Sequence, residues 1–285
     1  MAETSTAGTS GSGTRQYERD QRIESTPGFD MLRNAWETAQ LGGKVLRAMF
    51  RRPFNWLPDV IYESDLNFRR CLIPLGVSQA IWLIGFGVLN FGEVAALLGV
   101  SDRDPGGVYV GFLREVSTWI TMMIIAGAAG SALAADLGAR KIREELDALS
   151  VLGVDMVRKL VVPRVLAMII ACVILGLLGL LISILTNYAL YPNQEEFAPG
   201  VYRESTYLNI NALDLYASII KHAIIGAMIG LVACQKGLST KGGAEGVGRT
   251  VNQTVIVTFV GIWAINSLYN IAVLTLFPEL SVQKG

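Results

Sequence analysis

The sequence predicts an all-α membrane protein with five transmembrane helices. Three observations support this fold class: long stretches without charge, clusters of charge between them, and no series of short alternating strands. Hydrophobic residues make up 52% of the 285 residues and charged residues 17%, whereas a typical soluble domain carries about 25% charged residues. Backbone groups in lipid must be hydrogen-bonded within their own segment, so these uncharged stretches are expected to be helices.

Five segments reach the length of about 20 mostly apolar residues that a helix needs to cross the bilayer. The predicted spans are residues 71–92, 116–135, 165–191, 213–234 and 250–278. Only the fourth contains acidic, basic or histidine side chains, which are Asp214, Lys221 and His222.

Lys and Arg alternate between the connections, and this alternation predicts the orientation. Ten of them precede the first span, and the connections after the second and fourth spans are also basic. The loop around residues 102–105 contains only Arg103, and the connection at 192–211 contains only Arg203. We therefore expect a multi-pass protein of the plasma (inner) membrane, with its N-terminus in the cytoplasm and its C-terminus outside.

The segment before the first span predicts a helix in the headgroup layer. Residues 36–62 place apolar side chains at helical spacing (Leu41, Val45 and Met49) among basic and aromatic residues, a combination typical of interfacial helices. A soluble cytoplasmic helix is the alternative. Pro53 and Pro58 are expected to break the helix into pieces.

The connection at residues 136–155 predicts a short amphipathic helix between Gly138 and Gly153, two residues that can end helices. Its apolar positions repeat at helical spacing, with charged residues on the opposite face. Because two spans hold its ends, a push on this helix would move both of them. Either it docks on a nucleotide-binding partner or it is a solvated loop helix. The candidate coupling residues are Arg140, Arg143, Glu144, Glu145, Leu146, Asp147 and Leu149.

Small and ionisable residues within the spans form two further groups of candidates. Small residues allow close helix contacts, and the candidates for packing are Gly127, Gly130, Ser131, Gly226 and Gly230. Ionisable residues in a membrane are candidates for a substrate path, and these are Arg114, Glu115 and Lys221. Interfacial snorkelling or a local ion pair is the alternative for them.

Several function classes are disfavoured. One His and three scattered Cys residues give no metal-ligand spacing, and zero formal net charge gives no footprint for nucleic acid. The glycine-rich connection at 237–248 lacks the phosphate-binding GxxxxGK[ST] pattern and is expected to form a tight cytoplasmic turn. We therefore expect no cofactor, no metal and no enzyme activity in this chain, with any ATP hydrolysis on a partner.

Ordered motifs between Phe29 and Leu276 resemble the MlaE/YrbE permease family, the membrane subunits of Mla- and Mce-type ABC lipid transporters. Phe50-Arg-Arg-Pro-Phe54 and Ala135-Asp-Leu-Gly-Ala-Arg140 are most similar to the A-type YrbE subunit of actinobacterial Mce systems. The further motifs that carry the resemblance are Arg114-Glu115, the small-residue run to Ser131, Glu144-Glu-Leu-Asp-Ala-Leu149, Gly153-Val-Asp155, Val161-Val-Pro-Arg164, Gly237-Leu-Ser-Thr240, Gly242-Gly243, Gly246-Val-Gly248 and Asn252-Gln-Thr-Val255.

Two positions depart from the family pattern. Ser117 and Thr118 stand where members commonly have Gly-Pro, and Met156 stands where they often have Pro. The first departure is expected to reshape the mouth of the lipid cavity.

The resemblance implies that the helix at 139–152 is the coupling helix that docks on a cytoplasmic ABC ATPase. It also implies a second YrbE-type permease, usually as a heterodimer, with a lipid cavity between the two. Mce-domain proteins would lie on the outer side. The implied function is import of a fatty acid, sterol or phospholipid by alternating access. The alternatives are an ion-coupled secondary transporter and a non-transporting membrane anchor of an outer complex.

The expected organisation has three parts. Residues 1–28 form a disordered cytoplasmic tail, residues 29–66 an interfacial or elbow helix region, and residues 67–280 a permease domain with five spans and the coupling helix.

Overall fold

The computed structural model describes residues 27–51, 56–85, 97, 111, 115–190, 204 and 212–277. Throughout this part of the chain the regular elements are helices, which confirms the all-α class. Nearly all of the expected tail at residues 1–28 lies outside the described residues, and so does the candidate Arg114.

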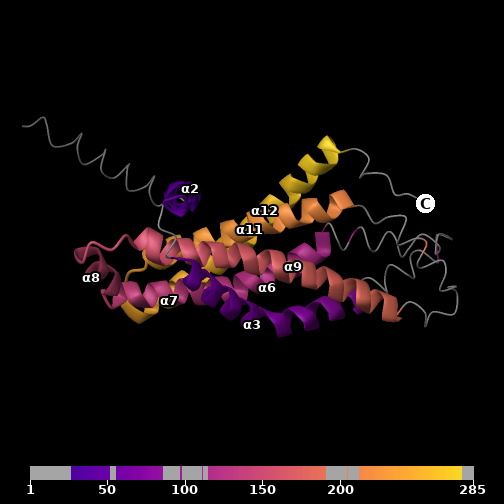
Figure 1. Ribbon diagram of the computed structural model, residues 1–285, viewed down its shortest axis with the longest axis horizontal. Coiled ribbons are helices and arrows are strands. Elements are labelled where there is room, and N and C mark those ends of the chain that lie inside the picture. Colours follow the sequence, from indigo (N-terminus) through magenta and orange to yellow (C-terminus); the bar gives the residue numbers. More distant parts are fainter. Residues whose placement is uncertain are drawn as a thin grey trace, which may run out of the picture.

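The bundle consists of long helices that run side by side along the longest axis of the molecule (Figure 1). Four described segments are long and apolar enough to cross a membrane, and they correspond to the second to fifth predicted spans. They are Ser117–Ile142, Val157–Thr186, Ala212–Leu238 and Gly243–Leu276. The first predicted span, 71–92, is described only to Gly85, on helix α3 (Leu57–Trp82) and the π-turn that follows it.

The second span is built from three consecutive elements that form one continuous rod. These are α6 (Ser117–Ile125), the π-helical turn η3 (Ala126–Gly130) and α7 (Ser131–Ile142). The third span begins with the π-helical turn η4 (Val157–Val161) and continues as α9 (Val162–Leu190). The fourth and fifth spans are α11 (Ala212–Leu238) and α12 (Gly243–Leu276).

The connection between the second and third spans differs from the prediction. Gly138 does not end a helix, because α7 continues to Ile142. A Cβ at Gly138 would lie 2.9 Å from the Thr240 hydroxyl, so this glycine permits a close approach to the end of α11. The single helix expected at 139–152 is instead divided at Glu144, whose φ of 59° is left-handed.

The second piece of that connection is α8 (Glu145–Val151), which protrudes at one extremity of the bundle (Figure 1), referred to below as the α8 end. It stops before Gly153, as expected, and Gly153 has a φ of 74°. A left-handed backbone of this kind suits a residue without Cβ.

The N-terminal helix α2 (Pro27–Met49) lies across the bundle, so that Figure 1 shows it nearly end-on. Val45 and Ala48 are buried, whereas Trp36, Leu46 and Phe50 are exposed. This distribution suits an interfacial helix, which stays a prediction. Contrary to the prediction, Pro58 does not break a helix. Helix α3 begins at Leu57, and a proline is well accommodated in the first turn of a helix.

Candidate functional site

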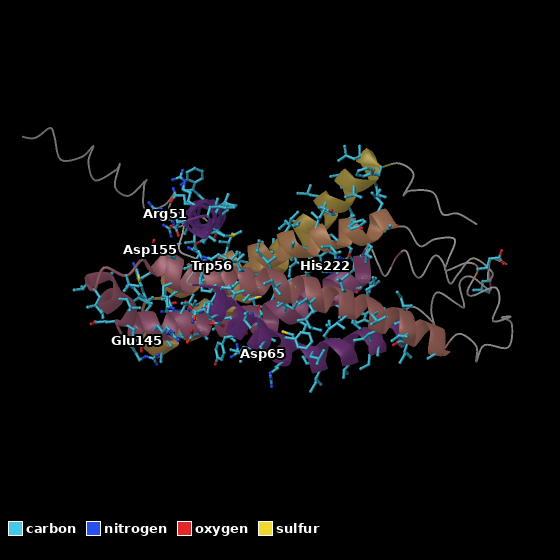
Figure 2. All side chains as sticks on the ribbon, viewed as in Figure 1. Arg51, Trp56, Asp65, Glu145, Asp155 and His222 are labelled. Atoms are coloured by element: carbon cyan, nitrogen blue, oxygen red, sulfur yellow. The ribbon has the colours of Figure 1, made fainter. Side chains whose placement is uncertain are left out.

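Helix α8 carries most of the predicted coupling residues. Lys141 Nζ lies 2.7 Å from Asp147 Oδ1, and Arg143 Nε lies 2.8 Å from Glu145 Oε1. Figure 2 shows Glu145 at the α8 end. These ion pairs connect the first turn of α8 to the end of α7. Helix α8 is therefore a short helix held against the end of the second span.

The apolar side chains of α8 are distributed differently from the prediction. Leu146 is 1% exposed and Leu149 is half-buried, whereas Val151 and Leu152 are 85% and 76% exposed. Leu146 therefore belongs to the interior of this chain and is not accessible to a partner. The prediction treated residues 139–152 as one continuous helix and assigned Leu146 and Leu152 to the same apolar face. This assignment was wrong because the left-handed backbone at Glu144 turns α8 relative to α7.

A second set of candidates meets between α6, α11 and α12. Glu115 accepts hydrogen bonds from Asn266 Nδ2, at 2.5 Å from Oε2, and from Asn270 Nδ2 at Oε1. Lys221 Nζ donates to Asn270 Oδ1 over 3.1 Å, and the Lys221 side chain is only 2% exposed. Asn270 thus bridges the two ionisable side chains that the sequence analysis named separately.

Glu115, Lys221 and Asn270 border a cavity of about 40 Å³, which is large enough for water molecules. Its polar lining consists of Glu115, Asp214, Ser218, Lys221, Tyr269 and Asn270. We refer to this feature as the α11–α12 pocket. Sequence reasoning missed Asn266 and Asn270 because amides do not interrupt an apolar stretch as charges do. Their spacing of four residues, which places both on one helix face, was the available signal.

A buried amide forms a further polar cluster at the start of α6. Gln79 Nε2 donates to the Ser117 carbonyl and to the Thr121 hydroxyl, each over 3.1 Å, and Ser183 donates to Gln79 Oε1 over 3.2 Å. Gln79 is 0% exposed and joins α3, α6 and α9. Ser117, one of the three residues that depart from the family pattern, therefore takes part in a contact between helices.

Of the small residues predicted to pack, three make close contacts. A Cβ at Gly226 would lie 2.8 Å from Cys172 Cβ, and one at Gly230 would lie 3.2 Å from Val165 Cα, both on α9. A Cβ at Gly130 would lie 3.1 Å from Ile229 Cγ2 on α11.

The other two candidates are less buried, since Gly127 is exposed and Ser131 is half-buried. A Cβ at Gly127 would meet nothing within 4 Å among the described residues, and the Ser131 hydroxyl bonds to the Gly127 carbonyl within its own helix. Gly127 is therefore a suitable control position, because a methyl group added there would contact no described neighbouring residue.

We expect Gly226→Ala to lower the thermal stability of the chain and Gly127→Ala not to lower it. The added methyl of Gly226→Ala overlaps Cys172 and the α9 backbone at Ile169, and overpacking costs about 1–3 kcal/mol. The midpoint of thermal unfolding in detergent would measure both variants. Equal midpoints for the two variants would contradict the close approach of α11 to α9.

Four ionic side chains meet at the α8 end, and the sequence analysis did not predict their contact. Arg164 Nη2 on α9 lies 2.7 Å from Asp136 Oδ2 on α7, and Arg164 Nε lies 3.3 Å from Glu63 Oε1 on α3. Arg140 Nε lies 3.1 Å from the same Asp136 oxygen. The Arg164 side chain is 6% exposed. Asp136 and Arg164 both lie in motifs that carry the family resemblance, which was the available signal.

The turn within the glycine-rich connection is shorter than expected, because α11 continues to Leu238 and α12 already begins at Gly243. Gly242 and Gly243 have φ values of 90° and 66°. A Cβ at Gly237 would lie 2.7 Å from Leu137 Cβ, so this glycine lets α11 approach α7. Within the described residues, no three His, Cys, Asp or Glu side chains converge as metal ligands do.

Comparison with known proteins agrees with this architecture. The chain is 34% identical over 163 residues to the chloroplastic Protein TRIGALACTOSYLDIACYLGLYCEROL 1 of Arabidopsis thaliana, covering 57% of this chain and 47% of that protein. It is 33% identical over 216 residues to a probable ABC transporter permease protein of Synechocystis, covering 72% and 82% of the two chains. A probable ABC transporter permease protein of Rickettsia prowazekii is 31% identical over 149 residues, 52% of this chain and 58% of that one.

The match thus spans about half the length of the Arabidopsis and Rickettsia relatives and most of the Synechocystis one. The family described as Permease MlaE matches residues 81–272. This range includes the α11–α12 pocket, α8 and the glycine-rich turn. The chain is therefore a multi-pass membrane transport subunit, not an enzyme, and it belongs to the MlaE family of ABC transporter permeases.

Proposed function

We propose that this chain is the permease subunit of an ATP-driven lipid importer of the Mce type, powered by a cytoplasmic ABC ATPase on a separate chain. The observation that carries this proposal is α8, a short helix that protrudes from the bundle and is held at both ends by spans. A force applied to α8 reaches the second and third spans directly. Alternating access then follows from movement of those spans around a lipid cavity.

The docking surface in this proposal combines charge with exposed apolar side chains. Glu144, Glu145 and Asp147 are exposed on the first turn of α8, and Val151 and Leu152 are exposed at its last turn. Carboxylates beside a small apolar patch suit a groove with a basic rim on the partner. Leu149 is half-buried next to this patch in the sequence, Arg143 orients Glu145, and Arg140 contacts Asp136 on α7.

The α11–α12 pocket is the proposed polar part of the substrate path. It places two carboxylates, an ammonium and an amide within otherwise apolar helices, where such groups are costly unless they serve a function. A lipid headgroup could exchange for these internal partners. Arg114, adjacent to Glu115 in the sequence, is proposed to belong to the same path.

The proposed assembly contains a second YrbE-type permease in a heterodimer, with Mce-domain proteins on the outer side. The C-terminal end of α12 angles away from the long axis of the bundle (Figure 1), and Trp263, Leu268 and Ile271 are exposed on the second half of this helix. Such a face suits either lipid or a partner helix. The resemblance to the A-type YrbE subunit supports the partner permease.

We expect single cysteines at Ser150 and Ser239 to be protected from an impermeant thiol reagent in intact cells, and one at Ser101 to react. The cells are first stripped of any outer envelope barrier. This result follows from the proposed orientation in the inner membrane, with the N-terminus in the cytoplasm and the C-terminus outside. The three native cysteines are buried and give a low background. Reaction at Ser150 would overturn the orientation.

The function itself is tested by purifying the chain with its natural partners. We expect an ATPase to co-purify, and ATP hydrolysis to be absent from the permease alone. Mass spectrometry of the bound lipids identifies the substrate class. Uptake driven by an ion gradient without ATP would favour the secondary transporter, to which the buried Lys221 and Glu115 would be suited. A stable outer complex without uptake would favour the anchor.

A further inference from the structure

We infer that Arg164 is a positioning residue that makes α3, α7 and α9 move as one body when α8 is pushed. This inference rests on the proposed docking of an ATPase at α8. It concerns the contacts between α3, α7 and α9 next to α8. Helix α8 is joined in the chain only to α7 and to η4, so movement of α3 requires a contact through side chains.

The first part of the argument is the contact between the two segments that hold α8. One is the end of α7, and the other is η4 followed by α9. Arg164 and Asp136 join them at a distance of 2.7 Å, 28 residues apart in the sequence. Arg140 lies 3.1 Å from the same carboxylate oxygen and holds it in place along α7.

The second part is the contact with α3, which is not adjacent to α8 in the chain. Glu63 Oε1 lies 3.3 Å from Arg164 Nε, so that one guanidinium contacts carboxylates on two different helices. Lys159 Nζ, within η4, also lies 2.8 Å from Asp59 Oδ2 near the start of α3, but these side chains are 57% and 40% exposed, so this pair contributes little.

The burial of Arg164 distinguishes this cluster from an ordinary surface pair. Its side chain is 6% exposed, whereas those of its partners Glu63 and Asp136 are 22% and 42% exposed. A buried charge that loses its partner is strongly unfavourable, so these contacts persist while the helices move. Arg69 and Asp65 on α3 form a pair of similar length, 2.8 Å, but they are 76% and 56% exposed and belong to one helix. Such a pair contributes little.

The position of the cluster along the chain gives it a mechanical role. The π-turn η4 lies between α8 and Arg164, and π-turns are irregular points at which a helix can bend. A movement of α8 that was absorbed at η4 would not reach the rest of α9. Arg164 lies beyond η4 in the chain and joins α9 to α7 and to α3. A movement of α7 would therefore displace α9 and α3 as well.

The test measures whether α3 follows α8. Spin labels are placed on cysteines introduced at Ser150, in α8, and at Ile73, which is 75% exposed on α3, in the full chain bound to its ATPase in nanodiscs. Adding ATP should leave this distance unchanged in the otherwise wild-type complex. In Arg164→Met the ATPase should remain bound, and the distance should shift by about 2 Å or more, the scale of helix movements in switching proteins.

Two further variants complete the design. Arg164→Lys, which keeps a charge but not the planar fork, should give a smaller shift. Arg69→Met is the matched control and should behave as the wild type. If Arg164→Met does not accumulate, Asp136→Asn leaves the Glu63 contact in place and is judged by the same criteria.

Each outcome decides a specific claim. An ATP-dependent change of distance in the wild type, or an unchanged distance in Arg164→Met or its substitute Asp136→Asn, overturns the role of Arg164 while the docking proposal stands. If no ATPase is retained by the wild-type chain, the docking proposal fails and this inference fails with it. A shift in the Arg164 variant but not in Arg69→Met supports the inference.

Discussion

The double substitution Glu144→Lys, Glu145→Lys is expected to release the ATPase from the permease and to abolish transport. Both side chains are exposed at the start of α8, so reversing their charge places repulsion at the proposed contact rather than merely removing attraction. We expect the affinity to fall at least about tenfold, which corresponds to about 1.4 kcal/mol of binding free energy. Co-purification of the ATPase with tagged permease measures the loss.

Folding of this variant should be unaffected. The Arg143–Glu145 pair that it breaks is exposed, and exposed pairs contribute little to the free energy of unfolding. Added positive charge on the cytoplasmic side also agrees with the proposed orientation. The matched control is Glu245→Lys, which reverses an 84% exposed carboxylate on the first turn of α12. If the double variant retained the ATPase while the control lost it, the docking site would be the glycine-rich turn.

Gly246→Ala should destabilise the whole chain. A Cβ at this position would lie 2.7 Å from the Lys241 carbonyl carbon and closer still to its oxygen. The backbone cannot yield easily here, because the Gly246 amide donates to the Gly242 carbonyl over 3.2 Å. The turn between α11 and α12 would have to open, and we expect the free energy of unfolding to fall by about 3 kcal/mol or more.

Gly248→Ala provides the comparison within the same helix. A Cβ there meets nothing within 4 Å of the described residues, and alanine favours a helix over glycine by about 1 kcal/mol. The thermal midpoints in detergent should therefore fall for Gly246→Ala and stay constant or rise for Gly248→Ala. Parallel behaviour of the two variants would show that the turn tolerates the added methyl.

The sequence alone determined the features that depend on local composition. Charge-free stretches predict membrane helices because lipid excludes unpaired polar groups, and the second to fifth spans agree with the described helices. Gly226 and Gly230 predicted a close helix contact, and the glycine-rich connection predicted a turn, which the structure confines to residues 239–242. Each of these predictions could be made from one short segment, because hydrophobic periodicity and residue type determine local structure over a few neighbouring positions.

Features that depend on distant partners were decided only by the tertiary structure. Asp136 meets Arg164 across 28 residues, and Glu115 meets Asn270 across 155. A single sequence contains no periodicity that links such pairs. The division of the predicted coupling helix at Glu144 is likewise a tertiary effect, because burial of Leu146 accompanies a left-handed backbone that local propensity does not favour. Local pattern thus determined where the helices lie, and packing determined which of their side chains meet.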